Sequence, residues 1–123
     1  MFWKKDSKDD VAEINWHNLT SIEQLEEIKD ESESQTILIY KHSTRCSISS
    51  MALNRLEREW SEGLGEIKSY FLDLIAYRQV SNAIEEIFGV YHESPQVIII
   101  KNGKAVYDAS HMAISAEMLK KHK

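Results

Sequence analysis

Residues 39–57 read IYKHSTRCSISSMALNRLE, and this stretch changes from a strand-like to a helix-like pattern. The β-branched and aromatic run QTILIYKH (35–42) shows little alternation, which predicts a central strand buried on both faces. From Cys46 onward, apolar residues recur at spacings of three and four, which predicts a helix with one buried stripe. The expected stripe consists of Ile48, Met51, Ala52, Leu53, Leu56 and Trp60. The only cysteine of the chain therefore lies where a strand gives way to a helix.

The rest of the chain predicts strands and helices in alternation. We expect strands at about 13–17, 67–75, 94–100 and 105–108, and helices at about 22–30, 78–89 and 114–122. Thr20 or Ser21 is the expected N-cap of the first helix. The glycines of SEGLGE (61–66) are expected to end the helix that follows Cys46, Gly89 to end the next one, and KNGK (101–104) to form a two-residue hairpin loop. The order β-α-β-α-β-α-β-β-α predicts a mixed sheet covered by helices on both faces.

Composition predicts one ordinary globular domain. The chain has 123 residues, with 42% hydrophobic and 28% charged residues. We expect residues 1–10 to form a charged, mobile leader and residues 11–123 to form a single domain. A net charge of −5 without a basic cluster argues against nucleic-acid binding. The first ten residues lack the apolar stretch of a signal peptide, and the apolar runs are too short to cross a bilayer, so a cytoplasmic location is expected.

A single cysteine excludes an intramolecular disulfide and favours a reducing compartment. On this prediction Cys46 lies in the first turn of a helix, where free N–H groups and the helix dipole favour a nucleophilic thiolate. Lys41 and Arg45 add positive charge close by in the sequence, and His42 does so when it is protonated and faces the thiol. The alternative is a small buried cysteine without reactivity. The polar flanks STR and SISS favour a site, although they also suit plain helix capping.

Together these segments resemble the thioredoxin fold, a three-layer α/β/α sandwich whose mixed central sheet ends in an antiparallel hairpin. The resemblance rests on TILIYKH, the helix start CSIS, then SPQVIII and KNGKAVYD in the expected order. Within that fold, KHSTRCSIS is most similar to the YtxJ-type monothiol bacilliredoxins, whose usual motif is T-C-P-I-S. Here Ser47 replaces the proline after the cysteine, and Arg45 separates Thr44 from Cys46.

The resemblance implies a cytoplasmic thiol-disulfide oxidoreductase that removes a low-molecular-weight thiol, such as bacillithiol, from mixed disulfides on client proteins. Cys46 is then the nucleophile, and no cofactor or metal is bound. The small thiol is a co-substrate, the partners are S-thiolated clients, and a thiol or a reductase resolves the adduct. Because Ser49 stands where thioredoxins have a second cysteine, no internal thiol can resolve it.

The remaining candidate site residues surround this thiol. Ser49 is a candidate hydrogen-bond donor to the thiolate, and Thr44, Arg45 and Ser47 are expected to shape the entrance. Pro95, cis by resemblance, is expected to hold the Ser94 backbone where an extended substrate can pair with it.

Three alternatives stay open at this point. The first is a non-catalytic thioredoxin-like interaction domain with an inert Cys46. The second is a cluster-binding monothiol glutaredoxin-like protein, which shares the C-x-x-S spacing but carries Gly and Phe where this chain has Ser47 and Ile48. The third is a redox sensor whose thiol is oxidised directly to a sulfenic acid.

Overall fold

A computed structural model describes residues 14–60 and 64–123 of the chain. The predicted leader, residues 1–10, and Gly63 of the predicted helix-ending segment lie outside the described residues. The elements follow in the order β1 (Trp16–Asn18), α2 (Glu23–Glu31), β2 (Ile37–His42), α3 (Ser47–Glu59), β3 (Lys68–Asp73), α4 (Arg78–Phe88), β4 (Gln96–Lys101), β5 (Lys104–Ser110), η2 (His111–Ala113) and α5 (Ala116–Lys121). Apart from the short 3₁₀ turn η2, this is the predicted order, and the mixed α/β fold is confirmed.

The five strands form one sheet in the order β1-β3-β2-β4-β5. β2 runs parallel to β3, and β3 runs parallel to β1, whereas β4 is antiparallel to both β2 and β5. β2 is therefore the central strand, and all six of its residues are buried, as the sequence predicted. The βαβ unit β2-α3-β3 places the start of α3 just beyond the carboxyl end of β2, which is where open α/β sheets commonly carry their sites.

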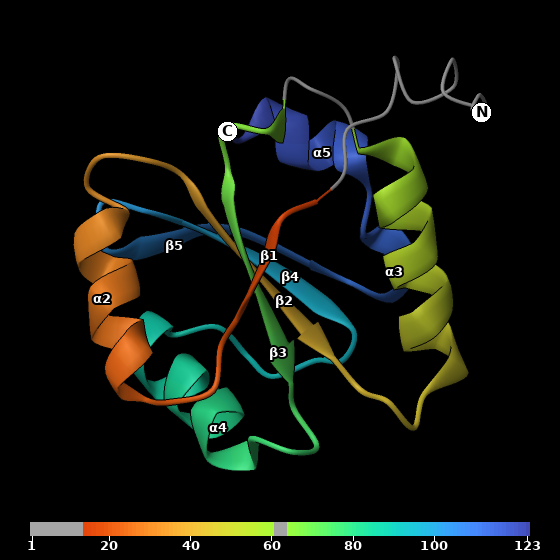
Figure 1. The fold of residues 1–123 in the computed structure, drawn as a ribbon, viewed down its shortest axis with the longest axis horizontal. Helices are drawn as coiled ribbons and strands as arrows, with labels where there is room; N and C mark the ends of the chain where they lie inside the picture. The colour runs from red at the N-terminus through yellow and green to blue at the C-terminus, as the bar shows by residue number, and fades with distance from the viewer. Residues whose placement is uncertain (1–13, 61–63) are drawn as a thin grey trace, which may run out of the picture.

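Two layers of helices cover the sheet, with α2 and α4 on one face and α3 and α5 on the other (Figure 1). Alternate residues of β2 reach the two cores, because successive side chains of a strand point to opposite faces. Ile37 and Ile39 pack in the core beneath α2 and α4, while Leu38 and Tyr40 pack in the core beneath α3 and α5. By the same alternation, Lys41 and His42 at the end of β2 point to opposite faces of the sheet.

The predicted apolar stripe of α3 is only partly correct. Ala52, Leu56 and Trp60 are buried, but Ile48 and Met51 are exposed. The side chain that is fully buried in the first turn is instead that of Ser49. The helix starts at Ser47, so Cys46 is its N-cap and lies one position before the first turn in which it was expected.

The remaining local predictions are mostly confirmed. Gly89 ends α4 with a φ of 70°, in the left-handed region that favours glycine. Asn102 and Gly103, with φ values of 52° and 78°, form the two-residue loop between β4 and β5. Thr20 and Ser21 do not cap α2, because the N-cap is Ile22. The side chain of Gln24 instead accepts hydrogen bonds from the Thr20 and Ser21 backbone N–H groups.

No helix among the described residues is long and apolar enough to span a membrane.

Candidate active site

Cys46 lies at the junction between the end of β2 and the start of α3, and its side chain is half-buried. Its backbone N–H donates to the Ser43 carbonyl at 3.2 Å, which closes the turn between strand and helix. Its carbonyl accepts from the backbone N–H groups of Ser49 and Ser50, at 3.1 and 3.3 Å. The thiol is thus carried on a backbone fixed from both sides, next to the N–H groups of a helix start, where negative charge is favoured.

Three of the predicted site residues flank the thiol with exposed side chains. Thr44 and Arg45 precede it in the turn, and Ser47 is the first residue of α3. Among the described residues, the structure shows no ion pair for the Arg45 guanidinium. The exposed Arg45 side chain is therefore available to pair with an anionic group from outside the chain.

Ser49 has a different environment from its exposed neighbours Ser47 and Ser50. It is fully buried, and its Oγ accepts a hydrogen bond from the Ser43 backbone N–H at 3.1 Å. The same oxygen lies 2.8 Å from Nδ1 of His42. The backbone carbonyl of Ser49 accepts a hydrogen bond from the Tyr40 hydroxyl at 3.1 Å. Ser49 therefore ties the first turn of α3 to the strand that precedes it.

The protonation of His42 decides where the single hydroxyl hydrogen of Ser49 points. Burial lowers the pKa of His42, and the charge of Asp73 offsets this only partly. Either neutral tautomer of His42 satisfies this contact, since Nδ1 can accept from the Ser49 hydroxyl or the Nδ1–H group can donate to Ser49 Oγ. No hydrogen bond joins Ser49 to the Cys46 sulfur in the described structure. In the tautomer whose Nδ1–H group donates to Ser49, the Ser49 hydroxyl hydrogen can point to another acceptor.

Pro95 lies at the same edge of the sheet as the thiol. Lys41 pairs with Gln96 across β2 and β4, so the segment that leaves β2 and the segment that enters β4 share one edge. The Ser94–Pro95 peptide bond is cis, and Pro95 is buried. The Ser94 hydroxyl oxygen is buried and has no hydrogen-bond partner among the described residues. The fold therefore places the turn that carries Cys46 and the Ser94–Pro95 pair beside each other at the carboxyl end of β2.

Lys41 does not add its charge to the thiol's side of the sheet, contrary to what its sequence position suggested. It follows Ile37 and Ile39 on the face covered by α2 and α4, while His42 contacts Tyr40 and Phe71 on the face covered by α3. Its Nζ lies 2.7 Å from His92 Nδ1 and 3.2 Å from Gln96 Oε1.

Sequence reasoning missed the contacts of Lys41 and His42, since both depend on pairing with distant segments. The available signal was the pair of polar residues that ends the buried run TILIYKH. Metal-binding clusters of three or more His, Cys, Asp or Glu side chains are absent from residues 14–60 and 64–123.

The chain is similar to a known protein family and to several solved structures. The family model of the monothiol bacilliredoxin BrxC matches residues 17–119. A solved structure with a thioredoxin fold is 30% identical, with a TM-score of 0.73, and the match covers 86% of this chain and 91% of that chain.

More distant matches show the fold alone. Thioredoxin from Trypanosoma brucei brucei is 15% identical with a TM-score of 0.69, covering 89% of this chain and 88% of its own. The thioredoxin of Fasciola hepatica is 16% identical with a TM-score of 0.67, covering 85% and 94%.

Proposed function

Because the chain belongs to the monothiol bacilliredoxin family, we propose that it removes a low-molecular-weight thiol from mixed disulfides on client proteins, with Cys46 as nucleophile. The observation that supports this most directly is the placement of the only cysteine. It occupies the N-cap position of α3 at the carboxyl end of the central strand, half-buried, within a thioredoxin-like oxidoreductase fold. A redox role follows from the family and the fold, and the residues around Cys46 supply the detail of the proposal.

The first step is an exchange of sulfur partners. The Cys46 thiolate attacks the small-thiol sulfur of the client's mixed disulfide and forms a new S–S bond. The original S–S bond breaks, and its electron pair leaves on the client sulfur, which takes up a proton. The client is reduced to its thiol, while Cys46 becomes a mixed disulfide with the small thiol. No electrons enter or leave the system as a whole.

The second step needs a thiol from outside the chain. Since Cys46 is the only cysteine, no second protein sulfur can attack the adduct. A free low-molecular-weight thiolate, or a reductase that delivers one, attacks the small-thiol sulfur of the adduct and releases the Cys46 thiolate. Bacillithiol is the proposed small thiol, and no bound cofactor is needed for either step.

The polar groups around the thiol have distinct proposed roles. The helix start at Ser47 stabilises the thiolate, and Arg45 attracts an anionic small thiol. Thr44 shapes the entrance beside it. Ser94, beside Pro95, offers its backbone to an extended client segment. Ser49 holds the turn in place through Ser43 and His42, and it donates to the thiolate when its hydroxyl turns.

Intact-mass spectrometry tests the proposal. The reduced protein is incubated with a single-cysteine peptide modified with bacillithiol, and separately with the same peptide modified with glutathione, and both products are weighed. We expect the protein to gain the mass of bacillithiol while the peptide loses it, and Cys46→Ala to gain nothing. If the wild type stays unmodified with both peptides, the proposal fails, and a non-catalytic interaction domain replaces it. Transfer from the glutathione peptide alone would reassign the small thiol.

A further inference from the structure

Lys41 is the one lysine that the structure shows fully buried among residues 14–60 and 64–123, and the exchange mechanism does not use it. Its hydrogen-bond partners are uncharged: His92 Nδ1 at 2.7 Å and Gln96 Oε1 at 3.2 Å. Neither ion pair found in the described residues includes it. A buried ammonium without a carboxylate in contact is costly, because it gives up hydration for weaker partners. Such a group calls for an explanation other than stability.

The contacts of Lys41 converge on the segment that precedes β4. His92 lies in that segment, and burial together with the nearby Lys41 charge lowers the pKa of its ring. The neutral ring can therefore accept a hydrogen bond from the ammonium. Gln96, at the start of β4, accepts at Oε1 from the Glu93 backbone N–H at 3.3 Å, and donates from Nε2 to the Tyr91 carbonyl at 3.0 Å. Lys41 and Gln96 together hold three consecutive residues, 91–93.

This anchored segment leads directly into Ser94 and Pro95. β2 thus anchors the two sides of the site from its two faces. On one face, His42 holds the first turn of α3 through Ser49. On the other face, Lys41 holds residues 91–93. Two adjacent residues of β2 therefore hold the two sides of the site: His42 holds the helix start next to the thiol, and Lys41 holds the segment that leads into Ser94.

We propose that Lys41 is a positioning residue, which fixes residues 91–93 and so sets where the Ser94 backbone meets a thiol-bearing peptide. The inference rests on the proposed function. It assigns Lys41 to the recognition of peptide clients rather than to the chemistry at sulfur. A small disulfide without a peptide backbone gains nothing from this anchoring.

The experiment compares Lys41→Met and His92→Ala with a matched control, Lys68→Met. Lys41→Met keeps the length of the side chain and removes its charge. His92 is exposed, so His92→Ala breaks the same contact without a change in the core. Lys68 lies on the neighbouring strand, where its ammonium contacts Glu31. Each protein is assayed for transfer from the bacillithiol-modified peptide over a range of peptide concentrations, for reaction with bacillithiol disulfide, and for alkylation of Cys46 by iodoacetamide.

For Lys41→Met and His92→Ala we expect the KM for the peptide to rise about tenfold, as the loss of a hydrogen bond to a charged group implies, with kcat little changed. Reaction with bacillithiol disulfide and alkylation should match the wild type, and Lys68→Met should match it throughout. A wild-type KM in either Lys41→Met or His92→Ala overturns the inference. Equal loss in all three assays also overturns it, because that outcome indicates general disruption. If the wild type itself takes no bacillithiol from the peptide, the proposed function fails instead.

Discussion

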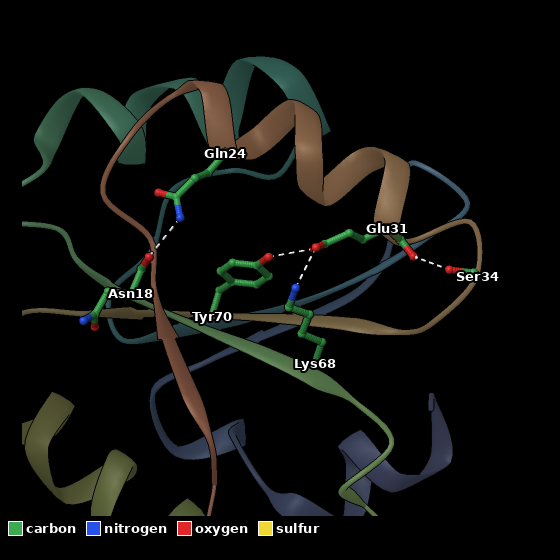
Figure 2. A network of polar contacts seen from close by, with 6 residues as sticks. All are labelled: Asn18, Gln24, Glu31, Ser34, Lys68 and Tyr70. Atoms are coloured by element: carbon green, nitrogen blue, oxygen red, sulfur yellow. Dashed lines mark hydrogen bonds and ion pairs between the residues drawn. The ribbon is translucent and has the colours of Figure 1, made fainter.

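Two lysines at opposite ends of the sheet show how differently the two ends are built. Lys41 lies near the carboxyl end of β2, and Lys68 opens the neighbouring strand β3 at the other end. The Nζ of Lys68 lies 2.6 Å from Glu31 Oε2, and the Tyr70 hydroxyl donates to the other oxygen of that carboxylate at 2.7 Å (Figure 2). Within residues 14–60 and 64–123, the Lys41 ammonium has no carboxylate partner and is hydrogen-bonded to His92 and Gln96. The Lys68 ammonium forms an ion pair near the surface, and the Lys41 ammonium is buried among neutral partners. The end of the sheet that carries the Lys68–Glu31 ion pair is called the paired end below.

The pKa values follow these surroundings. The hydrogen bond to Glu31 is the main cause that raises the pKa of Lys68. Burial lowers the pKa of Lys41 to about 8, although the charges of Glu85 and Glu93 oppose the shift. The ion pair with Glu31 thus favours the charged form of Lys68, whereas burial disfavours the charged form of Lys41. Such a local conflict is typical of functional sites.

The largest predicted difference in stability is between two serine-to-alanine substitutions, one at Ser49 near the thiol and one at Ser34 at the paired end. Ser49→Ala leaves the buried Ser43 N–H without its acceptor and His42 Nδ1 without its hydrogen-bond partner, so we expect a loss of about 1–3 kcal/mol in the free energy of unfolding. Ser34 is exposed and donates only to the Glu31 carbonyl, at 3.3 Å (Figure 2). Ser34→Ala should stay within about 0.5 kcal/mol of the wild type. Urea unfolding measures both, and equal losses would remove the distinction between the two ends.

The second largest effect is expected in how the free energy of unfolding changes with pH, which should differ between Lys41 and Lys68. The folded protein binds the Lys41 proton less tightly than the unfolded chain, whose lysine pKa is close to 10.5. The penalty of the buried charge is thus fully present below pH 8 and is relieved as the pH rises toward 10.5. Relative to Lys41→Met, the wild type should gain on the order of 1 kcal/mol between pH 7 and pH 9.5.

For Lys68, the effect of pH on stability has the opposite sign. Its raised pKa contributes stability that is present at neutral pH and is lost as the pH rises past the folded value. Relative to Lys68→Met, the wild type should gain nothing between pH 7 and pH 9.5. Urea unfolding of the three proteins at both pH values gives the comparison. Parallel pH curves for the wild type and Lys41→Met would show that the Lys41 ammonium is not desolvated in solution.

The elements of the fold could be predicted from the sequence because their signals are local. The uniform apolar run of β2 indicates a central strand, and the pair Asn102–Gly103 and the single Gly89 indicate particular turns. The place of Cys46 between a strand and a helix follows from the same periodicities. These features need no knowledge of which segments meet in space.

The surroundings of the site depend on distant segments and on the exact start of a helix. The helix pattern alone did not show that Ser49 points inward while Ile48 and Met51 face solvent, because this depends on how α3 lies against the sheet. Lys41 is separated from its partners His92 and Gln96 by 51 and 55 residues, and only the pairing of β2 with β4 brings them together. Proximity in sequence suggested that Lys41 serves the thiol, whereas the alternation of the strand directs it to the other face.

The smallest effect is expected at the paired end itself. Glu31→Gln removes the carboxylate that Lys68 and Tyr70 share, and an ion pair with side chains 26% and 29% exposed is worth about 0.2–1 kcal/mol. Burial raises the pKa of Glu31, but the hydrogen bonds from Lys68 and Tyr70 outweigh it, and the net pKa lies below 4.5. Its contribution is therefore present above that pH and is lost as the pH falls through the folded value.

The wild type should accordingly exceed Glu31→Gln in stability at pH 7 and converge with it in acid, while the rate of bacillithiol transfer stays unchanged. Added salt should narrow the difference at pH 7, since exposed ion pairs are screened. Urea unfolding at pH 7 and pH 3.5, together with the transfer assay, checks this. A Glu31→Gln protein with a KM for the bacillithiol-modified peptide as high as that of Lys41→Met would show that the two ends of the sheet are coupled. The effect of Lys41→Met could then no longer be assigned to the positioning of the client by Lys41.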